Sequence, residues 1–392
     1  MDALDAYRAL PPSKHGERFF AQGDPHREAR AHTGNDRAYT PIAVRSGFTY
    51  TLGPGESFGG VEKVAPEDFA KAVERMAVKR PEAKTWRPAD FPRLYRVKII
   101  KADASGHKQV SYLAGEDFVF DGTDGKVRGW SVAVDNAGYV HIVGGQHNTP
   151  DPAAYIPGSW ERLGLSRDRQ SDAFPNQMYF VSARPGDIES FEFVGARTNP
   201  RQIPSPGYLN YMNFAQDNNG ELYLYGRINV SGWQSWGLYR YDTRARRWAA
   251  LGGDACDVIA SARKKDPNWT SYLIRNIRGA IPSAPGDKSL VWAWQPNFYN
   301  YCRSSWGIYF DRTNRMHFRA PVRGLDANAR INDSDVYAWS DDGGRTFHRA
   351  DGTKVELPLT VNPAPEHNAD VNNHSSQAYW NLWHSLLRYA GY

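Results

Sequence analysis

Two segments of this chain of 392 residues repeat one pattern of turn and strand. Each begins with an Asp-x-x-Gly turn, at Asp135 and at Asp217, and each continues into a short run that is rich in apolar residues. Such a turn followed by a strand-like run is a β-hairpin signal. The two turns begin 82 residues apart, which is close to two propeller blades of about 40–45 residues each. The repeat predicts a succession of short antiparallel strands from about residue 94 onward.

The segment from Ser340 to Phe347 reads Ser-Asp-Asp-Gly-Gly-Arg-Thr-Phe and matches the Asp-box pattern Ser-x-Asp-x-Gly-x-Thr-aromatic. In such a turn the Asp accepts backbone hydrogen bonds, the glycine supplies unusual dihedral angles and the aromatic ring fills the blade. The motif therefore indicates an architecture and has no catalytic meaning of its own.

These patterns predict an all-β fold, a β-propeller of seven blades. We expect one propeller domain over residues 41–392, preceded by a polar arm over residues 1–40. One helical insert is predicted at about residues 66–80, because Pro66 suits the first turn of a helix and Pro81 stops it. Few residues remain after residue 350 for a last blade, so either the N-terminal region completes the ring or the chain departs from the usual pattern.

The charge of the chain gives a first indication of its partner. The formal net charge of +5 and the pI near 9.0 point mildly toward an anionic partner. The densest basic stretches, Arg244 to Arg247 and Arg263 to Lys265, are short, and no nucleic-acid recognition motif accompanies them. No apolar run approaches the length of a membrane span. An acidic polysaccharide fits the same charge, but the charge alone does not choose the partner, and we expect neither a nucleic acid nor a membrane.

The cysteines and histidines predict no cofactor. Only Cys256 and Cys302 are present, which excludes a disulfide framework and a zinc site made of cysteines. His367, His374 and His384 do not have a known zinc spacing, although a structural ion stays open. No Gly-rich phosphate loop or dinucleotide fingerprint occurs.

The polar start of the sequence shows no signal peptide, as expected of a secreted protein without its leader or of a cytoplasmic protein.

One hairpin carries the residues best suited to chemistry. Tyr211 and Arg227 lie 16 positions apart and nearly symmetric about the Asp217 turn, which predicts that they are opposite or diagonal neighbours on one face. Arginine can bind a carboxylate through two parallel hydrogen bonds. His147 ends the strand that follows the matching Asp135 turn. If the three side chains met at the central channel, they would suit removal of the C5 proton of a uronate.

These segments together resemble the BNR-repeat family, whose characterised members include ulvan lyases and a rhamnose–glucuronate lyase. The resemblance covers about residues 128–360 and rests on Gly138 to His141 with His147, Arg184 to Ile188, the pair Tyr211 and Arg227, and the Asp box. It implies a secreted polysaccharide lyase that cleaves an acidic, uronate-containing glycan by β-elimination, and we expect a monomer. It also implies the catalytic residues His147, Tyr211 and Arg227, and we add as substrate-binding candidates Asn148, Asn213, Tyr225 and Trp233.

Two other functions stay open. The Asp box is also typical of sialidase-like glycoside hydrolases, which need paired carboxylates, and no convincing pair occurs in the central segments. A non-catalytic glycan-binding propeller is the second alternative.

Several ulvan lyases carry another histidine just before the Arg-Pro-Gly-Asp turn, where this chain reads Asn176-Gln177-Met178-Tyr179. Gln295 likewise replaces a family arginine.

Overall fold

The structure is a computed structural model of the whole chain. The residues that it describes are 42–52, 61–63, 74, 94–116, 118, 120–121, 130–145, 162–166, 168, 171, 173–175, 177–205, 208–230, 233–254, 264, 290–291, 298–299, 308–325, 331–357, 359 and 370–372. The predicted arm at residues 1–40 lies outside them. So does the predicted helix at residues 66–80, apart from Glu74, which is helical and exposed.

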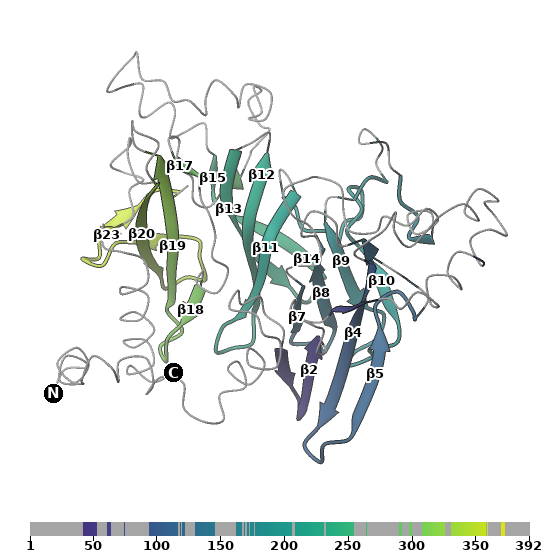
Figure 1. The fold of residues 1–392 in the computed structure, drawn as a ribbon. Helices are drawn as coiled ribbons and strands as arrows, with labels where there is room; N and C mark the ends of the chain where they lie inside the picture. The colour runs from purple at the N-terminus through teal and green to yellow at the C-terminus, as the bar shows by residue number, and fades with distance from the viewer. Residues whose placement is uncertain are drawn as a thin grey trace. The chain divides into compact units, whose positions relative to one another are not determined.

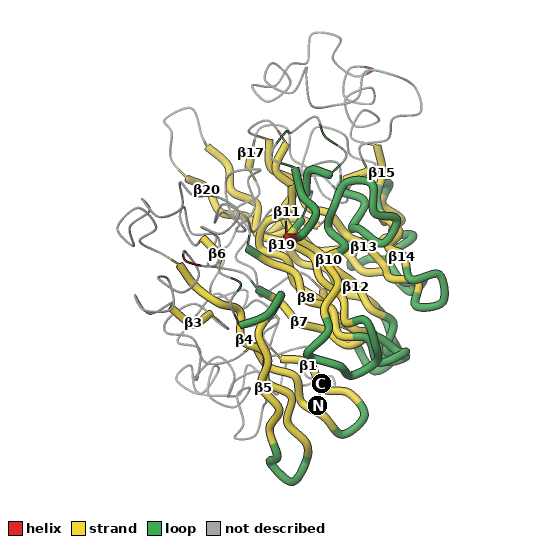
Figure 2. The backbone as a smooth tube through the Cα atoms, turned by 90° about the vertical axis from the view of Figure 1, so that its right-hand side faces the viewer, coloured by secondary structure: helices red, strands yellow, loops and turns green. Residues whose placement is uncertain are grey.

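The described part of the chain is built from β-strands, shown in yellow in Figure 2, and its only helical residues are Glu74, Arg162 and Lys264. The predicted all-β fold is therefore confirmed. The chain divides into two compact units. The first comprises Met1–Arg27, Ala215–Arg240 and Ala250–Tyr392, and the second comprises Glu28–Phe214 and Tyr241–Ala249.

The second unit contains a six-stranded antiparallel sheet organised around one long strand, β4. The order is β1-β2-β4-β3, and β5 and β6 also pair with β4. Figure 1 shows β4 and β5 in blue as a long two-stranded ribbon. The strands are β1 (Ile42–Arg45), β2 (Phe48–Leu52), β3 (Val61–Lys63), β4 (Leu94–Asp103), β5 (Lys108–Tyr112) and β6 (Phe120–Asp121).

The same unit contains a four-stranded antiparallel meander in the order β10-β9-β8-β7. Every residue of β7, β8 and β9 is buried, because both faces of these strands are covered, whereas β10 is partly exposed. This meander is the kind of sheet that the hairpin repeat predicts for a blade. Its strands are β7 (Ser131–Val134), β8 (Val140–Gly144), β9 (Met178–Ser182) and β10 (Phe191–Phe193).

A second four-stranded sheet has the order β11-β12-β13-β14. Its central pair is antiparallel, with Tyr223 opposite Arg240 and Val230 opposite Trp233. The strands are β11 (Tyr208–Gln216), β12 (Leu222–Val230), β13 (Trp233–Asp242) and β14 (Arg247–Leu251).

The remaining strands belong to the first unit. β15 pairs with β16, and a seven-stranded antiparallel sheet has the order β17-β19-β20-β21-β22, with β18 paired to β19 and β23 paired to β20. The long hairpin β19–β20 is its centre (Figure 1). These strands are β15 (Gly253–Asp254), β16 (Leu290–Val291), β17 (Phe298–Tyr299), β18 (Ile308–Phe310), β19 (Met316–Leu325), β20 (Ile331–Ser340), β21 (Phe347–His348), β22 (Lys354–Val355) and β23 (Asp370–Asn372).

The predicted Asp-x-x-Gly turns form at both positions. The carboxylate Oδ1 of Asp135 accepts hydrogen bonds from the backbone N–H groups two and four residues later, both at 2.9 Å, and Gly138 has a φ of 87°. Asp217 accepts the same two bonds at 2.9 and 2.8 Å. A third copy begins at Asp311, where Asn314 takes the place of glycine with a φ of 65°. In each turn the aspartate side chain thus accepts hydrogen bonds from backbone N–H groups that the tight turn leaves without a backbone partner.

The Asp box has the predicted geometry. Asp342 Oδ1 accepts the backbone N–H groups of Arg345 and Thr346, at 3.0 and 2.9 Å. Gly343 and Gly344 have φ values of 71° and 86°, in the left-handed region that favours glycine, and the Phe347 ring is fully buried. The motif is a structural turn, as the sequence indicates.

Candidate functional site

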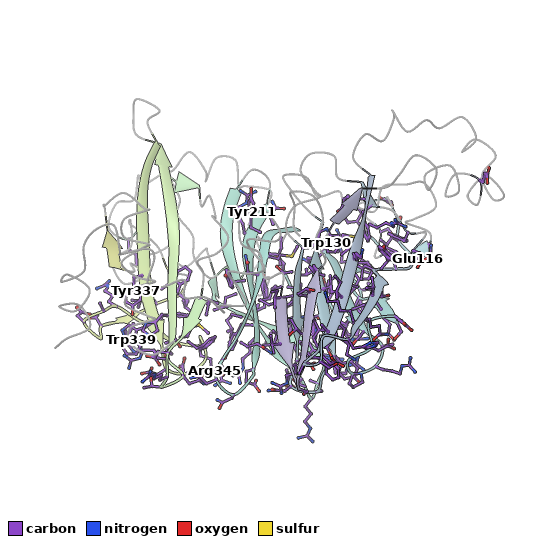
Figure 3. The ribbon with its side chains drawn as sticks, turned by 60° about the horizontal axis from the view of Figure 1, so that its bottom comes forward. Glu116, Trp130, Tyr211, Tyr337, Trp339 and Arg345 are labelled. Atoms are coloured by element: carbon purple, nitrogen blue, oxygen red, sulfur yellow. The ribbon has the colours of Figure 1, made fainter. Side chains whose placement is uncertain are left out.

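Tyr211 is the most unusual residue among the predicted catalytic groups. It lies inside β11 with a φ of 51°, a left-handed conformation that a bulky side chain rarely adopts within a strand. Its side chain is only 4% exposed. Figure 3 shows it toward one end of its ribbon. Backbone strain of this kind persists only where the surroundings impose it, and it is frequent at functional sites.

Asn213 is one of the groups that hold this conformation. Its side-chain Nδ2 donates a hydrogen bond of 2.8 Å to the backbone carbonyl of Tyr211, and Asn213 itself is buried. Asn213 is one of the residues predicted from the sequence to bind substrate. In the structure its amide N–H is engaged in fixing the tyrosine backbone, so its observed contact is a positioning one.

Arg227 and Tyr225 lie on β12, two positions apart, and therefore project from the same face of that strand. Arg227 is 1% exposed and Tyr225 is 5% exposed. A guanidinium is almost never fully buried unless it is paired. Arg227 stands opposite Trp236 on β13, and Tyr225 stands opposite Leu238.

The strands β11 and β12 that carry Tyr211 and Arg227 are neighbours in the order of one sheet. The turn between them closes with a hydrogen bond from Asp217 N to Glu221 O. Tyr211 and Arg227 belong to different compact units, and the separation of their side chains stays a prediction.

The other predicted site residues are placed only in part. His147 and Asn148 lie outside the described residues, which stop at Gly145, directly after β8, and resume at residue 162. Trp233 is the first residue of β13 and pairs with Val230, and its side chain lies outside the described part. Their roles therefore stay predictions.

A second histidine, His141, lies at the centre of a buried chain of hydrogen bonds. Its Nδ1 is 2.7 Å from the hydroxyl of Tyr179 and its Nε2 is 3.3 Å from Asp135 Oδ2. The indole N–H of Trp248 donates to the same Tyr179 oxygen at 3.0 Å. Since an indole only donates, one proton order satisfies the chain, in which Tyr179 donates to Nδ1 and Nε2–H donates to Asp135.

Burial sets the protonation of this chain. Removal from water lowers the pKa of His141, although Asp135 opposes the shift, and burial raises the pKa of Tyr179 well above its usual range. His141 is therefore neutral and Tyr179 keeps its proton. Since His141 is also fully buried, this chain is structural, as the position of the residue in the strand body indicates.

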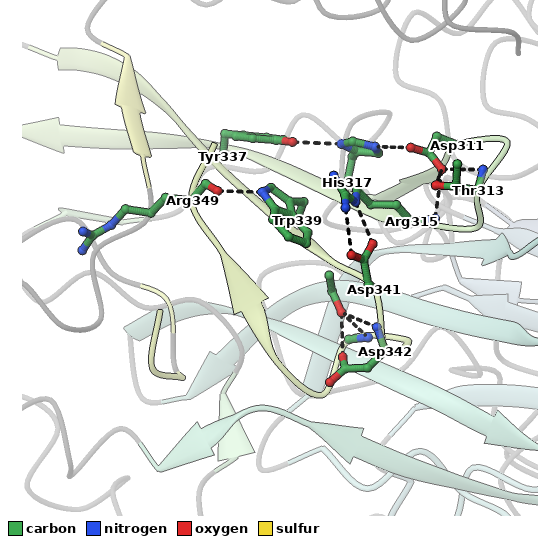
Figure 4. Close-up of polar contacts among 11 residues, drawn as sticks. Asp311, Thr313, Arg315, His317, Tyr337, Trp339, Asp341, Asp342 and Arg349 are labelled. Atoms are coloured by element: carbon green, nitrogen blue, oxygen red, sulfur yellow. Dashed lines mark hydrogen bonds and ion pairs between the residues drawn. The ribbon is translucent and has the colours of Figure 1, made fainter. Parts of the chain in front are cut away.

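The first unit contains a similar chain around His317, drawn in Figure 4. Its Nδ1 is 2.9 Å from the hydroxyl of Tyr337 and its Nε2 is 3.1 Å from Asp311 Oδ2. Beside it, Arg315 forms two hydrogen bonds with the Asp341 carboxylate and lies 3.8 Å over the Trp339 ring. No pattern in the sequence predicted this chain of hydrogen bonds.

Within the described part of the chain, no group of three or more His, Cys, Asp or Glu side chains is arranged to hold a metal ion. The described residues also include no helix that is long and apolar enough to cross a membrane.

The family described as "BNR repeat-containing family member" matches residues 161–379. No curated protein matches the chain. Among solved structures, polysaccharide lyase Uly1 is similar at 12% identity with a TM-score of 0.46, covering 92% of this chain and 64% of that one. An ulvan lyase of the PL25 family, bound to -[GlcA(1-4)Rha3S]-, has 12% identity and a TM-score of 0.43, covering 86% and 59%.

An endo-arabinase from Bacteroides thetaiotaomicron VPI-5482 is also similar, at 13% identity with a TM-score of 0.29, covering 69% of this chain and 77% of that one. The chain spans less than two thirds of the length of each of the two lyases.

Proposed function

The chain belongs to the BNR repeat-containing family, and we propose that it is a polysaccharide lyase that cleaves a uronate-containing glycan by β-elimination. The observation that carries the proposal is the backbone of Tyr211. A buried tyrosine with a φ of 51°, its carbonyl bound by Asn213, is a strained residue at the position expected for the proton-transfer group.

In the proposed reaction the base removes the C5 proton of a uronate. The electron pair of that C–H bond forms the C4=C5 double bond, the C4–O bond breaks, and the acid protonates the leaving oxygen. Arg227 would pair with the uronate carboxylate as negative charge develops beside it. Tyr211 and His147 would share the roles of base and acid. Neither a redox cofactor nor a nucleotide takes part.

The substrate we propose is ulvan-like or a rhamnose–glucuronate polymer, in keeping with the net charge of +5. Asn148, Tyr225 and Trp233 are proposed to contact the neighbouring sugar units. We further propose a secreted monomer in which the four-stranded meanders are blades of a seven-bladed propeller. The meander order of β7–β10 and the blade-type turns support this architecture.

The direct test is incubation of the full chain with a panel of uronate polysaccharides while ultraviolet absorbance is followed. A lyase creates a conjugated unsaturated uronate and the absorbance rises. Release of reducing ends without this rise would indicate a sialidase-like hydrolase. Binding without either signal would indicate a non-catalytic glycan-binding protein.

Variants of the two proposed catalytic residues test the mechanism. Arg227→Ala should lower turnover by about 10²–10³, because one preorganised donor to the developing charge is lost. Tyr211→Phe keeps the ring and removes the hydroxyl, so turnover should fall by about 10²–10⁴ while folding survives. Tyr223→Phe is the matched control, since it removes another buried tyrosine hydroxyl, from β12. A Tyr211→Phe protein with near wild-type turnover would show that the tyrosine only lines the site.

A further inference from the structure

Among the described residues of the second unit, two buried amide side chains have no hydrogen-bond partner. Gln177 and Asn210 are both 0% exposed. Among the described residues, neither the amide nitrogen nor the amide oxygen of either side chain has a partner. The great majority of buried side-chain polar atoms are hydrogen-bonded, so two amides that lack all their bonds need an explanation. One explanation is a ligand that supplies the missing hydrogen bonds.

The position of Gln177 is fixed by its backbone. It directly precedes β9, and its carbonyl accepts a hydrogen bond of 3.0 Å from Tyr179 N. A Cβ atom added at Gly195 would lie 1.8 Å from the Gln177 carbonyl oxygen, so only glycine allows this close approach. The first residue of β9, Met178, pairs with Gly144, the last residue of β8. Gln177 therefore lies where β8 ends.

Asn210 directly precedes Tyr211 in β11, and the register of the strands brings it to the same end of the unit. The Ser131 hydroxyl on β7 donates a buried hydrogen bond of 2.7 Å to the carbonyl of Met212 on β11. Ser131 pairs with Val143 on β8, and Val143 pairs with Tyr179 on β9. The starts of β7, β9 and β11 thus lie together with the end of β8, away from the Asp135 turn.

We propose that the side-chain amides of Gln177 and Asn210 bind hydroxyl groups of the glycan next to Tyr211 and help to determine which sugar the chain accepts. The assignment rests on the proposed function. An amide offers both donors and an acceptor, and a hydroxyl matches both, whereas a carboxylate only accepts and would leave the amide oxygen unpaired. Tyr211 is buried as well, so the proposed binding requires the side chains that cover these groups to move aside.

The test uses the full chain with Gln177→Met and, separately, Asn210→Leu, which replace each amide by an apolar group. Each KM for the cleaved polysaccharide should rise about five- to tenfold, the size expected for one lost neutral hydrogen bond, with little change in kcat. A hydroxyl away from the reacting carbon is bound equally in the ground state and in the transition state. Each variant should also melt at the same or a higher temperature without glycan, because an unsatisfied buried amide is removed.

Met178→Leu is the control, because it changes a buried neighbour without touching an amide. Asn210→Ala replaces the leucine variant if the larger side chain prevents folding. An unchanged KM together with a lower melting temperature would show that the amides are internal structural groups and would overturn this assignment alone. A wild-type chain that cleaves no uronate polysaccharide would overturn the proposed function, and this assignment with it.

Discussion

The hydrogen-bond chains around His141 and His317 have one local geometry and very different surroundings. In both, a histidine lies six residues after the aspartate of a turn, and its Nε2 meets Oδ2 of that aspartate, at 3.3 and 3.1 Å. Nδ1 meets a tyrosine hydroxyl of the next strand, at 2.7 and 2.9 Å. In both chains the tyrosine lies on the strand that pairs with the histidine's strand, two positions from the residue directly opposite the histidine.

The chains differ in what covers them. His141 and Asp135 are 0% exposed, and the rings of Phe214, Tyr241 and Trp248 pack around the imidazole. The His317 and Asp311 side chains are 14% and 21% exposed. The spacing of the turn and the strands thus sets the geometry, while packing from distant segments sets the burial. The same arrangement of turn and histidine should therefore contribute more to stability around His141 than around His317.

The largest expected difference is between His141→Ala and His317→Ala. The first leaves a buried carboxyl and a buried phenol without their partner and opens a cavity, so we expect a loss of about 3–5 kcal/mol in the free energy of unfolding. The second leaves groups that water reaches, and we expect about 1 kcal/mol. Denaturant unfolding of both variants measures the difference, and equal losses would contradict the role given to burial.

A smaller difference is expected between Tyr179→Phe and Tyr337→Phe. Without its hydroxyl, Tyr179 no longer accepts from the Trp248 indole or donates to His141, and both partners stay buried. We expect a loss of about 1–3 kcal/mol for this variant and about 0.5–1.5 kcal/mol for Tyr337→Phe. The Trp248 fluorescence of the folded Tyr179→Phe protein reports whether the indole has kept its place. A Tyr337 variant that is the less stable of the two would reverse the comparison.

The sequence predicts those parts of the fold that depend on contacts between residues close together in the chain. The turns at Asp135 and Asp217 and the Asp box depend on hydrogen bonds that span at most four positions, so their patterns are visible in the chain. The third turn, at Asp311, was missed because Asn314 stands where the pattern requires glycine. Asparagine tolerates the left-handed conformation better than most residues, and its φ here is 65°.

The sequence predicts less of the candidate site, because the features of this site depend on packing between residues that are distant in the chain. The hairpin symmetry indicates that Tyr211 and Arg227 belong to neighbouring strands, and the sheet order confirms that point. The left-handed backbone of Tyr211 and the burial of Gln177 and Asn210 come from packing between strands that are distant in the sequence. An isolated glutamine before a strand has no signature that separates it from a surface residue.

The pH dependence of stability gives the smallest and most selective test. Burial lowers the pKa of His141 and of His317 below the value of about 6.5 that applies in the unfolded chain. The unfolded chain then binds more protons as the pH falls below about 6.5, so stability is complete above that pH and declines below it. One proton contributes at most about 1.4 kcal/mol per pH unit.

Around His141, Arg201 and Arg246 add to the downward shift of the pKa and Asp135 opposes it, while His317 faces Asp311, Arg315 and Asp341. We expect His141→Gln and His317→Gln each to flatten the decline in unfolding free energy between about pH 8 and pH 5. The flattening should be greater for His141, because no water reaches its ring to accommodate a charge. Denaturant unfolding at several pH values measures both slopes. If His317→Gln flattens the profile more, the partly exposed chain governs the acid response, and burial is not what separates the two regions.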